Sequence, residues 1–531
     1  MKQSVEKALK NIIHFGDTDI FPFLFERFLF EEKFEECAKI LLEINKDFEH
    51  YISSTPPLTE VKLSQVGYFG FRNATQIEPF WNAYFLSLVI EIANEIERTR
   101  IAIGENITFS YRYNWDETAS SLFRDITWND YRLKCLEHSK KSRFVIQTDI
   151  SDFYARINHH KLENELQRLK IDGNIAKKIM KLLSSFSGTV SYGLPVGGPA
   201  SRILAELALN NTDKHLRARG VKFCRYVDDY SLFCDNESDA YKILILLSDK
   251  LGNDGLNLQK NKTKIISSEE FSSIHYFLDP LRKDDPIADE EQKLLSISIQ
   301  FDPYSPTAQE DYVELKSAVN SIDIIGILSK EVQKTKIDQT VTKQAINSIR
   351  VLNAKAQLQS IRILLDPTNL VTLSPVFTTV MRCVRAVYKD LPQKGKDLID
   401  KSLIGLFDTK SHLVNIDLNV NYIIQILSFS HSSRKEELLV KLYETSSDHL
   451  LRRQIILIMG NWGCHYWLSD LKKKFNTLTT WERRAFIYSS YSLGDEGNHW
   501  RQHNKNHFDP FEVLIRDWVS KRKSESAQII P

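Results

Sequence analysis

Residues 144–157 read FVIQTDISDFYARI, and two further blocks follow along the chain, SYGLPVGGPASRILAE at 191–206 and CRYVDDYSLF at 224–233. The first block is a short apolar run that ends at Asp149, which predicts a buried strand with a carboxylate at its end. In the third block, two apolar runs flank Asp228 and Asp229, which predicts a β-hairpin with both carboxylates near its turn. We therefore expect a site built from three aspartates.

Adjacent carboxylates repel one another unless a cation lies beside them. Carboxylate ligands suit a hard divalent cation, and Mg²⁺ fits best, with Mn²⁺ as a substitute. Two such ions, about 3.5–4 Å apart, would hold the attacking and leaving oxygens of a phosphoryl transfer. The expected catalytic residues are Asp149, Asp228 and Asp229, and the expected metal ligands are the same three carboxylates with the backbone carbonyl of Ile150.

In order and spacing, the three blocks resemble motifs A, B and C of reverse transcriptases, with Tyr226-Val227-Asp228-Asp229 as the YxDD box. The segment GLNLQKNKTKII, which starts at Gly255, resembles the following motif D and places Lys262 at its lysine. The resemblance covers roughly residues 105–280. It implies a nucleotidyltransferase with polymerase fingers and palm, and it assigns Tyr154 as the steric gate that excludes a ribose 2′-OH.

Motif B departs from the common pattern of Leu-Pro-Gln-Gly followed by Ser-Pro. This chain has Val196 in place of the glutamine and Arg202 in place of the second proline. A valine side chain cannot make the hydrogen bonds that glutamine would make beside nucleotide and template, so templated copying is not expected to be faithful. Gly197 and Gly198 still allow the backbone to approach a nucleotide closely.

A closer resemblance rests on HFGDTDIFPFLFE at 14–26, the Ser-Tyr-Arg box at 110–112, LPVGGPASR and a long helical C-terminal region. Together these resemble the abortive-infection (Abi) polymerases of bacteria. The resemblance implies a cytoplasmic, oligomeric enzyme that makes single-stranded DNA from dNTPs without a template, primes on its own tyrosine and protects the cell from phage. Arg112 is the expected triphosphate contact. Tyr51 and Tyr68 are the candidate primers, and the product would stay covalently attached.

Composition fits this plan. The chain has 531 residues with a formal net charge of +1, and its 19 Gly and 15 Pro are few, which favours long helices. We expect an α+β fold: right-hand fingers and palm with a helical N-terminal part over 1–285, joined to an all-α, HEAT-like repeat domain over 286–531 in place of a thumb. Residues 1–100 are predicted to be helical, with one long helix over 79–101, and two more helices are predicted over 161–185 and 200–219. No apolar run is long enough to span a membrane, and no cysteines have the spacing of a zinc site.

Basic and aromatic residues alternate between 450 and 485, where the local charge balance is +5. Such a mixture suits a path for single-stranded DNA, although a solvated basic face over buried tryptophans is an equal alternative. The expected path residues are Lys472, Lys473, Lys474 and Arg483.

Two other functions stay open on the sequence. One is a templated RNA-directed DNA polymerase of the retron or intron kind. The other is a catalytically silent scaffold whose helical array senses a phage component. Val196 opposes the first, and the intact aspartate set opposes the second.

Overall fold

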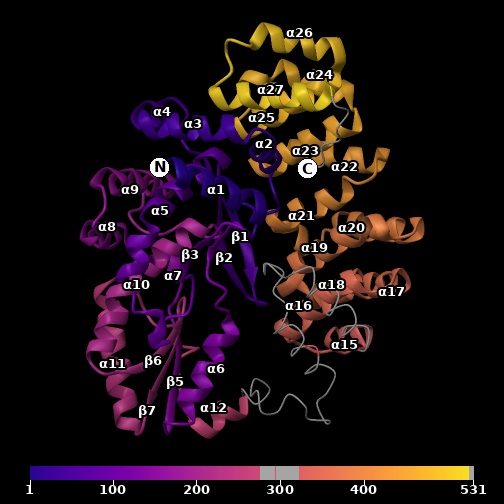
Figure 1. Cartoon of the computed structure of the whole chain (residues 1–531). Helices are drawn as coiled ribbons and strands as arrows, with labels where there is room; N and C mark the ends of the chain where they lie inside the picture. Colours follow the sequence, from indigo (N-terminus) through magenta and orange to yellow (C-terminus); the bar gives the residue numbers. More distant parts are fainter. Residues whose placement is uncertain (275–293, 295–321, 525–531) are drawn as a thin grey trace.

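The computed structural model describes residues 1–274, 294 and 322–524, so the predicted domain boundary at 285/286 lies outside the described residues. The chain forms two halves that lie side by side (Figure 1). Residues 1–274 combine helices with three small sheets, and residues 322–524 are helical. The predicted combination of an α+β half and an all-α half is confirmed for this part of the chain.

A four-stranded antiparallel sheet forms the palm, in the order β6-β7-β5-β8. Its strands are β5 (Phe144–Asp149), β6 (Lys222–Tyr226), β7 (Asp229–Cys234) and β8 (Lys264–Ser267). The predicted strand and hairpin are therefore both present. Val145 packs into one hydrophobic cluster and its neighbour Ile146 into another, so both faces of β5 are buried. This explains why its sequence is a continuous apolar run rather than an alternating one.

Helices cover the palm on both faces. Their bounds are α6 (Trp128–Ser139), α7 (Phe153–Arg156), α8 (His159–Arg168), α9 (Gly173–Ser187), α10 (Pro199–Ala218), α11 (Glu237–Asn253) and α12 (Ser268–Ile274). The single helix predicted over 161–185 is instead the pair α8 and α9. The carboxylate of Asp172 caps α9 by accepting from the Asn174 amide, which starts a new helix after the break.

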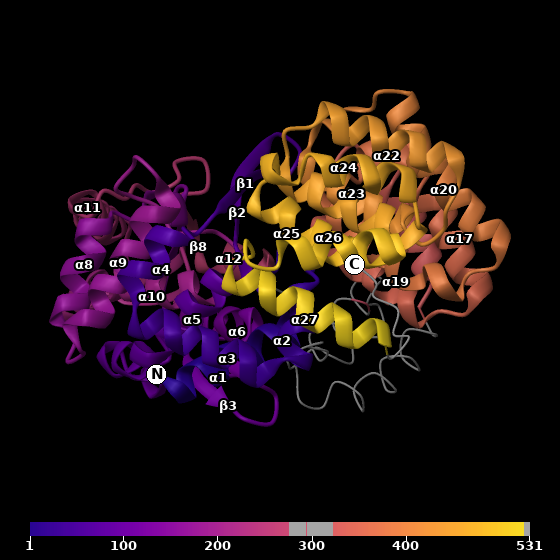
Figure 2. The same ribbon diagram turned by 90° about the horizontal axis from the view of Figure 1, so that it is seen from above.

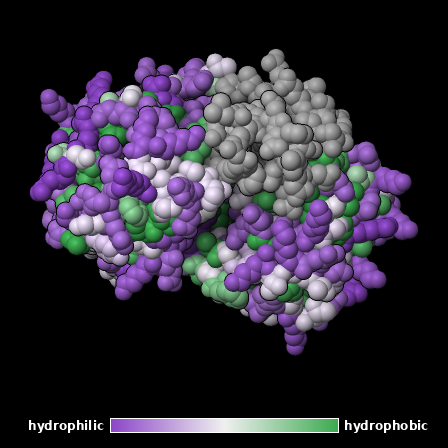
Figure 3. Space-filling view, turned by 90° about the horizontal axis from the view of Figure 1, so that it is seen from below, coloured by the Kyte–Doolittle hydropathy of each residue, from purple (hydrophilic) through white to green (hydrophobic). Residues whose placement is uncertain are grey.

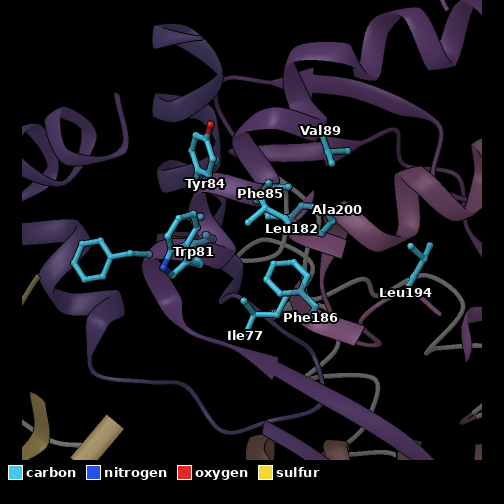
Figure 4. Packing of buried hydrophobic residues seen from close by; sticks show 14 of the residues in the cluster. Ile77, Trp81, Tyr84, Phe85, Val89, Leu182, Phe186, Leu194 and Ala200 are labelled. Carbon is cyan, nitrogen blue, oxygen red and sulfur yellow. The ribbon is translucent and has the colours of Figure 1, made fainter. Parts of the chain in front are cut away.

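Five helices and a hairpin make up the first hundred residues. The helices are α1 (Lys2–Phe15), α2 (Glu26–Glu32), α3 (Phe34–Lys46), α4 (Phe48–Ser54) and α5 (Pro79–Thr99), the last as predicted. Helix α5 starts at Glu78, whose carboxylate accepts from the amides of Phe80 and Trp81. It is buried on nearly all sides because other helices surround it. Figure 4 shows its aromatic side chains beside Phe186 of α9, with 5.4 Å between the ring centroids of Phe85 and Phe186.

The prediction that residues 1–100 are helical is wrong between 59 and 77. Strands β1 (Thr59–Val66) and β2 (Gly70–Ile77) form an antiparallel hairpin there, and its turn contains Gly67 with a φ of 68°. Only glycine adopts that conformation without strain. A second small hairpin, β3 (Tyr113–Asp116) and β4 (Ser121–Phe123), was also not predicted.

The C-terminal half is a succession of helices, as predicted. The α-helices are α15 (Ile324–Glu331), α16 (Gln339–Ser348), α17 (Ala354–Leu364), α18 (Pro367–Thr372), α19 (Phe377–Val387), α20 (Gln393–Asp408), α21 (Asp417–Leu427), α22 (Ser433–Thr445), α23 (His449–Trp462), α24 (His465–Lys473), α25 (Thr480–Ser489), α26 (Gly494–Asn504) and α27 (Pro510–Ser524). Helix α18 begins after Asp366, whose carboxylate caps it, and has Pro367 as its first residue. No helix of the described residues combines the length and the apolarity needed to cross a bilayer.

Buried ion pairs join the two halves. Arg453 of α23 pairs with Glu26, and Arg484 of α25 pairs with Glu78. Lys62 of β1 reaches Asp448 at 3.0 Å. Figure 2 shows α27 lying across the N-terminal helices, where the Trp518 indole donates to the Glu32 carboxylate at 2.8 Å. The helical half is thus fixed against residues 1–274 at several points.

Candidate active site

The palm sheet brings the three aspartates together. Asp149 ends β5 and lies opposite Asp229 in the register with β7. The Ile150 amide donates to the carbonyl of Asp228 at 3.2 Å, which fixes the end of β5 against the hairpin turn. The predicted convergence of Asp149, Asp228 and Asp229 is therefore what the strand register produces.

Electrostatics at this cluster favour a cation. Burial, with the charges of Asp149 and Asp229 added, raises the pKa of Asp228 to about 7. Burial and Asp149 raise the pKa of Asp229 to about 6. Lys262 pairs with Asp149, and although burial opposes its charge, that hydrogen bond and ion pair raise the pKa of the lysine. One lysine faces three carboxylates.

These residues fit divalent metal ions. The Oδ1 atom of Asp149 is buried and accepts no hydrogen bond, so a strong acceptor lacks a partner in the middle of the cluster. A metal ion would satisfy that atom and relieve the repulsion that raises the two pKa values. Asp149, Asp228 and Asp229 are the side chains that would hold it. The role expected for the Ile150 carbonyl stays a prediction.

The turn of the YxDD hairpin is held in an unusual conformation. Val227 has a φ of 55°, a left-handed backbone that β-branched residues rarely adopt. Its amide donates to the Ser110 hydroxyl at 2.8 Å, and its carbonyl accepts from Arg225 at 2.7 Å. Ser110 in turn donates to Glu206 of α10. The Ser-Tyr-Arg box therefore holds the turn that carries Asp228 and Asp229, through the Ser110 hydroxyl. The spacing of the motifs in the sequence did not predict this role.

Arg112, the expected triphosphate contact, is engaged by other parts of the protein. Its guanidinium is buried, pairs with Glu97, and donates to the carbonyl of Ile101 at 2.9 Å. The reason is that the box packs under the palm, so its arginine joins the structural network rather than an open surface. Arg112 is thus a poor candidate for a triphosphate contact.

Arg202 of motif B is a second arginine close to predicted site residues, because Tyr111 and Tyr154 lie near it. Its guanidinium lies 5.2 Å from the centre of the Tyr111 ring and pairs with Asp19 at 2.6 Å. Burial opposes its charge, but Tyr111, Asp19 and Tyr154 hold its pKa above the usual range. In the sequence, Arg202 stood out only because it replaces the second proline of motif B. Its position one residue after the motif B serine is the feature that could have identified it as a site residue.

Tyr154 lies close enough to the aspartates for their charge to affect its pKa. Burial, then Tyr111, raises the pKa of Tyr154 well above its usual range, and the Asp228 carboxylate adds to that shift. A hydrogen bond links Tyr154 to Tyr111. The gate role of Tyr154 stays a prediction, and this position is compatible with it.

The motif B loop packs against the N-terminal segment. A Cβ added at Gly197, whose φ is 130°, would collide with the Thr18 hydroxyl, and one at Gly198 would lie 3.4 Å from the Asp17 carbonyl. Val196 packs against the hydrophobic cluster of the helical half, and its carbonyl accepts from Thr75 at 3.2 Å. The two glycines thus allow a close approach of residues 17–20, and their contact with a nucleotide stays a prediction.

The remaining predicted residues lie apart from the aspartates. Tyr51 in α4 is 3.5 Å from Glu43, and the Tyr68 hydroxyl donates to Thr372 at 2.9 Å. Among the expected path residues, Lys472 pairs with Glu496, Lys473 with Asp470 and Arg483 with Glu512, while Lys474 is exposed. Acids thus pair with three of these four residues: Glu496 and Glu512 come from beyond the basic segment, whereas Asp470 lies within it.

Comparison with known proteins agrees with the site. Residues 102–299 match the family model of reverse transcriptase (RNA-dependent DNA polymerase). That segment carries all three aspartates, so the reverse transcriptase domain indicates a nucleotidyltransferase that makes DNA. Reverse transcriptases act through divalent metal ions, which fits the acceptor set described above.

Other similarities are weaker. No curated protein matches the chain in sequence. Solved structures that are similar include telomerase from Candida albicans in complex with a TWJ fragment of telomeric RNA, at 10% identity and a TM-score of 0.30, covering 66% of this chain and 67% of that one. Apo telomerase from Candida tropicalis is 12% identical with a TM-score of 0.29, covering 72% and 74%.

Proposed function

We propose that the protein is a Mg²⁺-dependent polymerase of bacterial anti-phage defence that joins dNTPs into single-stranded DNA without a template. Metal-dependent synthesis rests on the three aspartates and the partnerless Asp149 Oδ1. Independence from a template rests on one observation: Val196, at the motif B position that reads the nascent pair in other enzymes, packs into the hydrophobic cluster of the helical half.

Arg202 is our candidate for the triphosphate. A guanidinium matches phosphate oxygens with two parallel hydrogen bonds, and this one is held beside Tyr111 and Tyr154. With Mg²⁺ bound, the metal ions would lower the charge repulsion between a nucleophile and the triphosphate. The chain itself would orient the nucleotide through Arg202 and restrict the sugar through Tyr154.

The primer is proposed to be a tyrosine of the chain. A phenol becomes a nucleophile once a metal or a base lowers its pKa. The contacts of Tyr51 and Tyr68 do not bring either hydroxyl to the aspartates. Tyr192 is 52% exposed and forms an isolated bridge with Asn158, just after motif A, so we add it to the two candidates.

Defence against phage, oligomerisation and a HEAT-like character of the helical half belong to the same proposal. They rest on the resemblance carried by residues 14–26, the Ser-Tyr-Arg box and motif B. The domains proposed are fingers and palm over 1–285 and the helical domain over 286–531.

One experiment tests the proposal. The purified protein is incubated with Mg²⁺ and labelled dNTPs, without nucleic acid, and the product is run on denaturing gels before and after proteolysis. We expect DNA that migrates with the protein until proteolysis, and mass spectrometry of the linked peptide to name one tyrosine. Product without an attached peptide would remove tyrosine priming.

A templated RNA-directed DNA polymerase is the second candidate, because the family model that matches residues 102–299 is of that kind. It requires activity only after a primed RNA template is added. Replacement of Tyr154 by alanine separates a gate from a packing role: the gate predicts that ribonucleotides are then incorporated. Phage protection that survives Asp228→Asn, together with no incorporation, would support the silent scaffold instead.

A further inference from the structure

The β1–β2 hairpin has two unlike faces. Lys62, Ser64, Ala74 and Gln76 are buried on the face toward the helical half. Large hydrophobic residues are exposed on the rest of the hairpin: Val61 by 50%, Leu63 by 52%, Val66 by 51%, Phe69 by 86% and Phe71 by 51%. Five of the thirteen large hydrophobic residues exposed in the described part of the chain thus lie on one hairpin, and a cluster of that kind marks an interaction surface.

Cations surround the tip of this hairpin. The Lys336 ammonium lies 5.8 Å from the centre of the Phe69 ring. Partial burial and the neighbouring charge of Arg72 lower the pKa of Lys343 in α16. Within residues 1–274, 294 and 322–524, no ion pair engages Arg72, Lys336 or Lys343.

The nearby acids are committed to other partners. Asp338 caps α16 by accepting from the amides of Thr340 and Val341. Glu331 accepts from the Asp338 amide at 2.8 Å and pairs with Lys334. Neither acid forms an ion pair with Arg72, Lys336 or Lys343 in the described part of the chain, whereas Lys472 pairs with Glu496 and Arg483 with Glu512.

The hairpin joins this surface to the palm. At its base, the Thr75 amide donates to the Val196 carbonyl of the motif B loop at 3.2 Å. At its tip, the Tyr68 hydroxyl donates to Thr372 at 2.9 Å and accepts from the Ile337 amide at 3.0 Å. Phe71 lies four residues from Thr75, which is about 13 Å along a strand. Figure 1 places the hairpin between the two halves, and Figure 3 shows a hollow between them that hydrophobic surface borders in part.

We propose that the tip of this hairpin binds single-stranded DNA through the exposed rings of Phe69 and Phe71 and the cations beside them, Arg72, Lys336 and Lys343. Arg72 pairs with Ser64 in the strand register, so its side chain lies on the helical-half side of the tip, opposite Val61 and Leu63. The cations contact backbone phosphates, and bases stack on Phe69 and Phe71. Stacking on a ring that is 86% exposed requires unpaired bases, which selects a single strand over a duplex. The proposal rests on the proposed function only in taking the strand to be the palm's own product.

The test uses the full chain carrying Asp228→Asn, which binds without synthesising. Anisotropy of a fluorescein-labelled oligothymidylate gives its affinity at several salt concentrations. Phe69→Ala is expected to weaken binding about tenfold by loss of stacking. Arg72→Gln combined with Lys343→Gln is expected to reduce the slope of log Kd against log salt by about 1.4, since each phosphate contact on a single strand contributes about 0.7.

Matched controls lie in the basic patch predicted from the sequence. Tyr466→Ala removes an aromatic that is 64% exposed, and Lys472→Gln removes a lysine paired with Glu496. Neither is expected to change affinity or slope. Unchanged binding by Phe69→Ala, or equal losses in the controls, would overturn the proposal.

Two further outcomes are distinguishable. If Phe69→Ala lowers the sedimentation coefficient and leaves DNA affinity unchanged, the face joins copies of the chain and the proposal fails. If the variants bind as expected but the native protein incorporates no dNTP, the binding surface stands and the proposed function falls.

Discussion

Two regions of this molecule bury charge in opposite ways. In the palm, three carboxylates share one lysine, and the crowding raises the pKa of Asp228 to about 7. At the boundary between the halves, the two buried arginines each have an acid of their own, Arg453 with Glu26 and Arg484 with Glu78, and both side chains of the second pair are 2% exposed. The palm thus keeps a repulsion that a bound cation relieves, whereas these two arginine pairs have no such deficit. The first arrangement serves chemistry and the second serves stability.

The largest expected effect comes from Asp228→Asn in the palm. Loss of a metal ligand should reduce dNTP incorporation at least about a thousandfold, because metal ions supply several kcal/mol of transition-state stabilisation. The same change should raise the Tm of the metal-free protein by a few degrees. A raised carboxyl pKa means that stability falls as pH rises from about 4 to 7, so at pH 8 the asparagine removes a cost.

Asp235→Asn is the matched control, since Asp235 is exposed just after β7 and lies outside the cluster. It should alter neither incorporation nor Tm. A lower Tm in the Asp228 variant would show that repulsion among the carboxylates does not destabilise the palm. The contrast between the palm and the boundary would then be wrong.

At the boundary the expected effect has the opposite sign. Arg484→Met leaves the Glu78 carboxylate buried without its cation, which should reduce the free energy of unfolding by about 3–5 kcal/mol. Urea unfolding followed by tryptophan fluorescence measures it. Adding Glu78→Gln should recover part of the loss, because it removes the buried charge. The glutamine oxygen can accept from only one of the Phe80 and Trp81 amides, which donate to different oxygens of Glu78, so the recovery should be incomplete.

Arg434→Met provides the comparison, because Arg434 and Asp408 are 66% and 53% exposed in their pair. An exposed pair of this kind contributes under about 1 kcal/mol. Equal losses in the Arg484 and Arg434 variants would mean that packing alone holds the halves together.

The same contrast explains how much the sequence could predict. Local signals sufficed for β5, whose apolar run is buried on both faces, and for the long helix α5. They failed at the β1–β2 hairpin because its pattern is inverted: Val61 and Leu63 are exposed while Lys62 and Ser64 are buried. The acid that pairs with Lys62 is Asp448 of the helical half, which lies nearly four hundred residues later in the chain.

The residues of the candidate site likewise include some that the sequence predicts and others that it does not. Motif spacing identified the three aspartates and Lys262, since strand ends fix where those side chains meet. It could not decide which arginine is available near Tyr154, because Arg112 pairs with Glu97, and Arg202 lies beside Tyr111 in a pair with Asp19, far away in the sequence. Side-chain direction depends on tertiary contacts that no local pattern encodes.

Metal binding should depend on pH in the palm. Asp228 and Asp229, with pKa values of about 7 and 6, must lose their protons to hold a cation. The apparent affinity for Mn²⁺ should therefore fall about tenfold or more from pH 8 to pH 6. Electron paramagnetic resonance of free Mn²⁺ measures it, with Asp228→Asn as the control that removes most of this dependence. A flat profile would mean that the carboxylates are already ionised without metal.

The smallest effect is expected where the two regions meet, at the pair of Asp19 and Arg202. Their side chains are 54% and 24% exposed, so Asp19→Asn should change the free energy of unfolding by less than about 1 kcal/mol. A triphosphate, however, must compete with Asp19 for the guanidinium. Releasing Arg202 should lower the KM for dNTP about two- to fivefold with kcat unchanged, whereas Asp19→Glu should keep both. A raised KM would show instead that Asp19 positions Arg202 for the nucleotide. The pair would then resemble the paired arginines of the boundary, and not the aspartates of the palm, whose charges lack a partner.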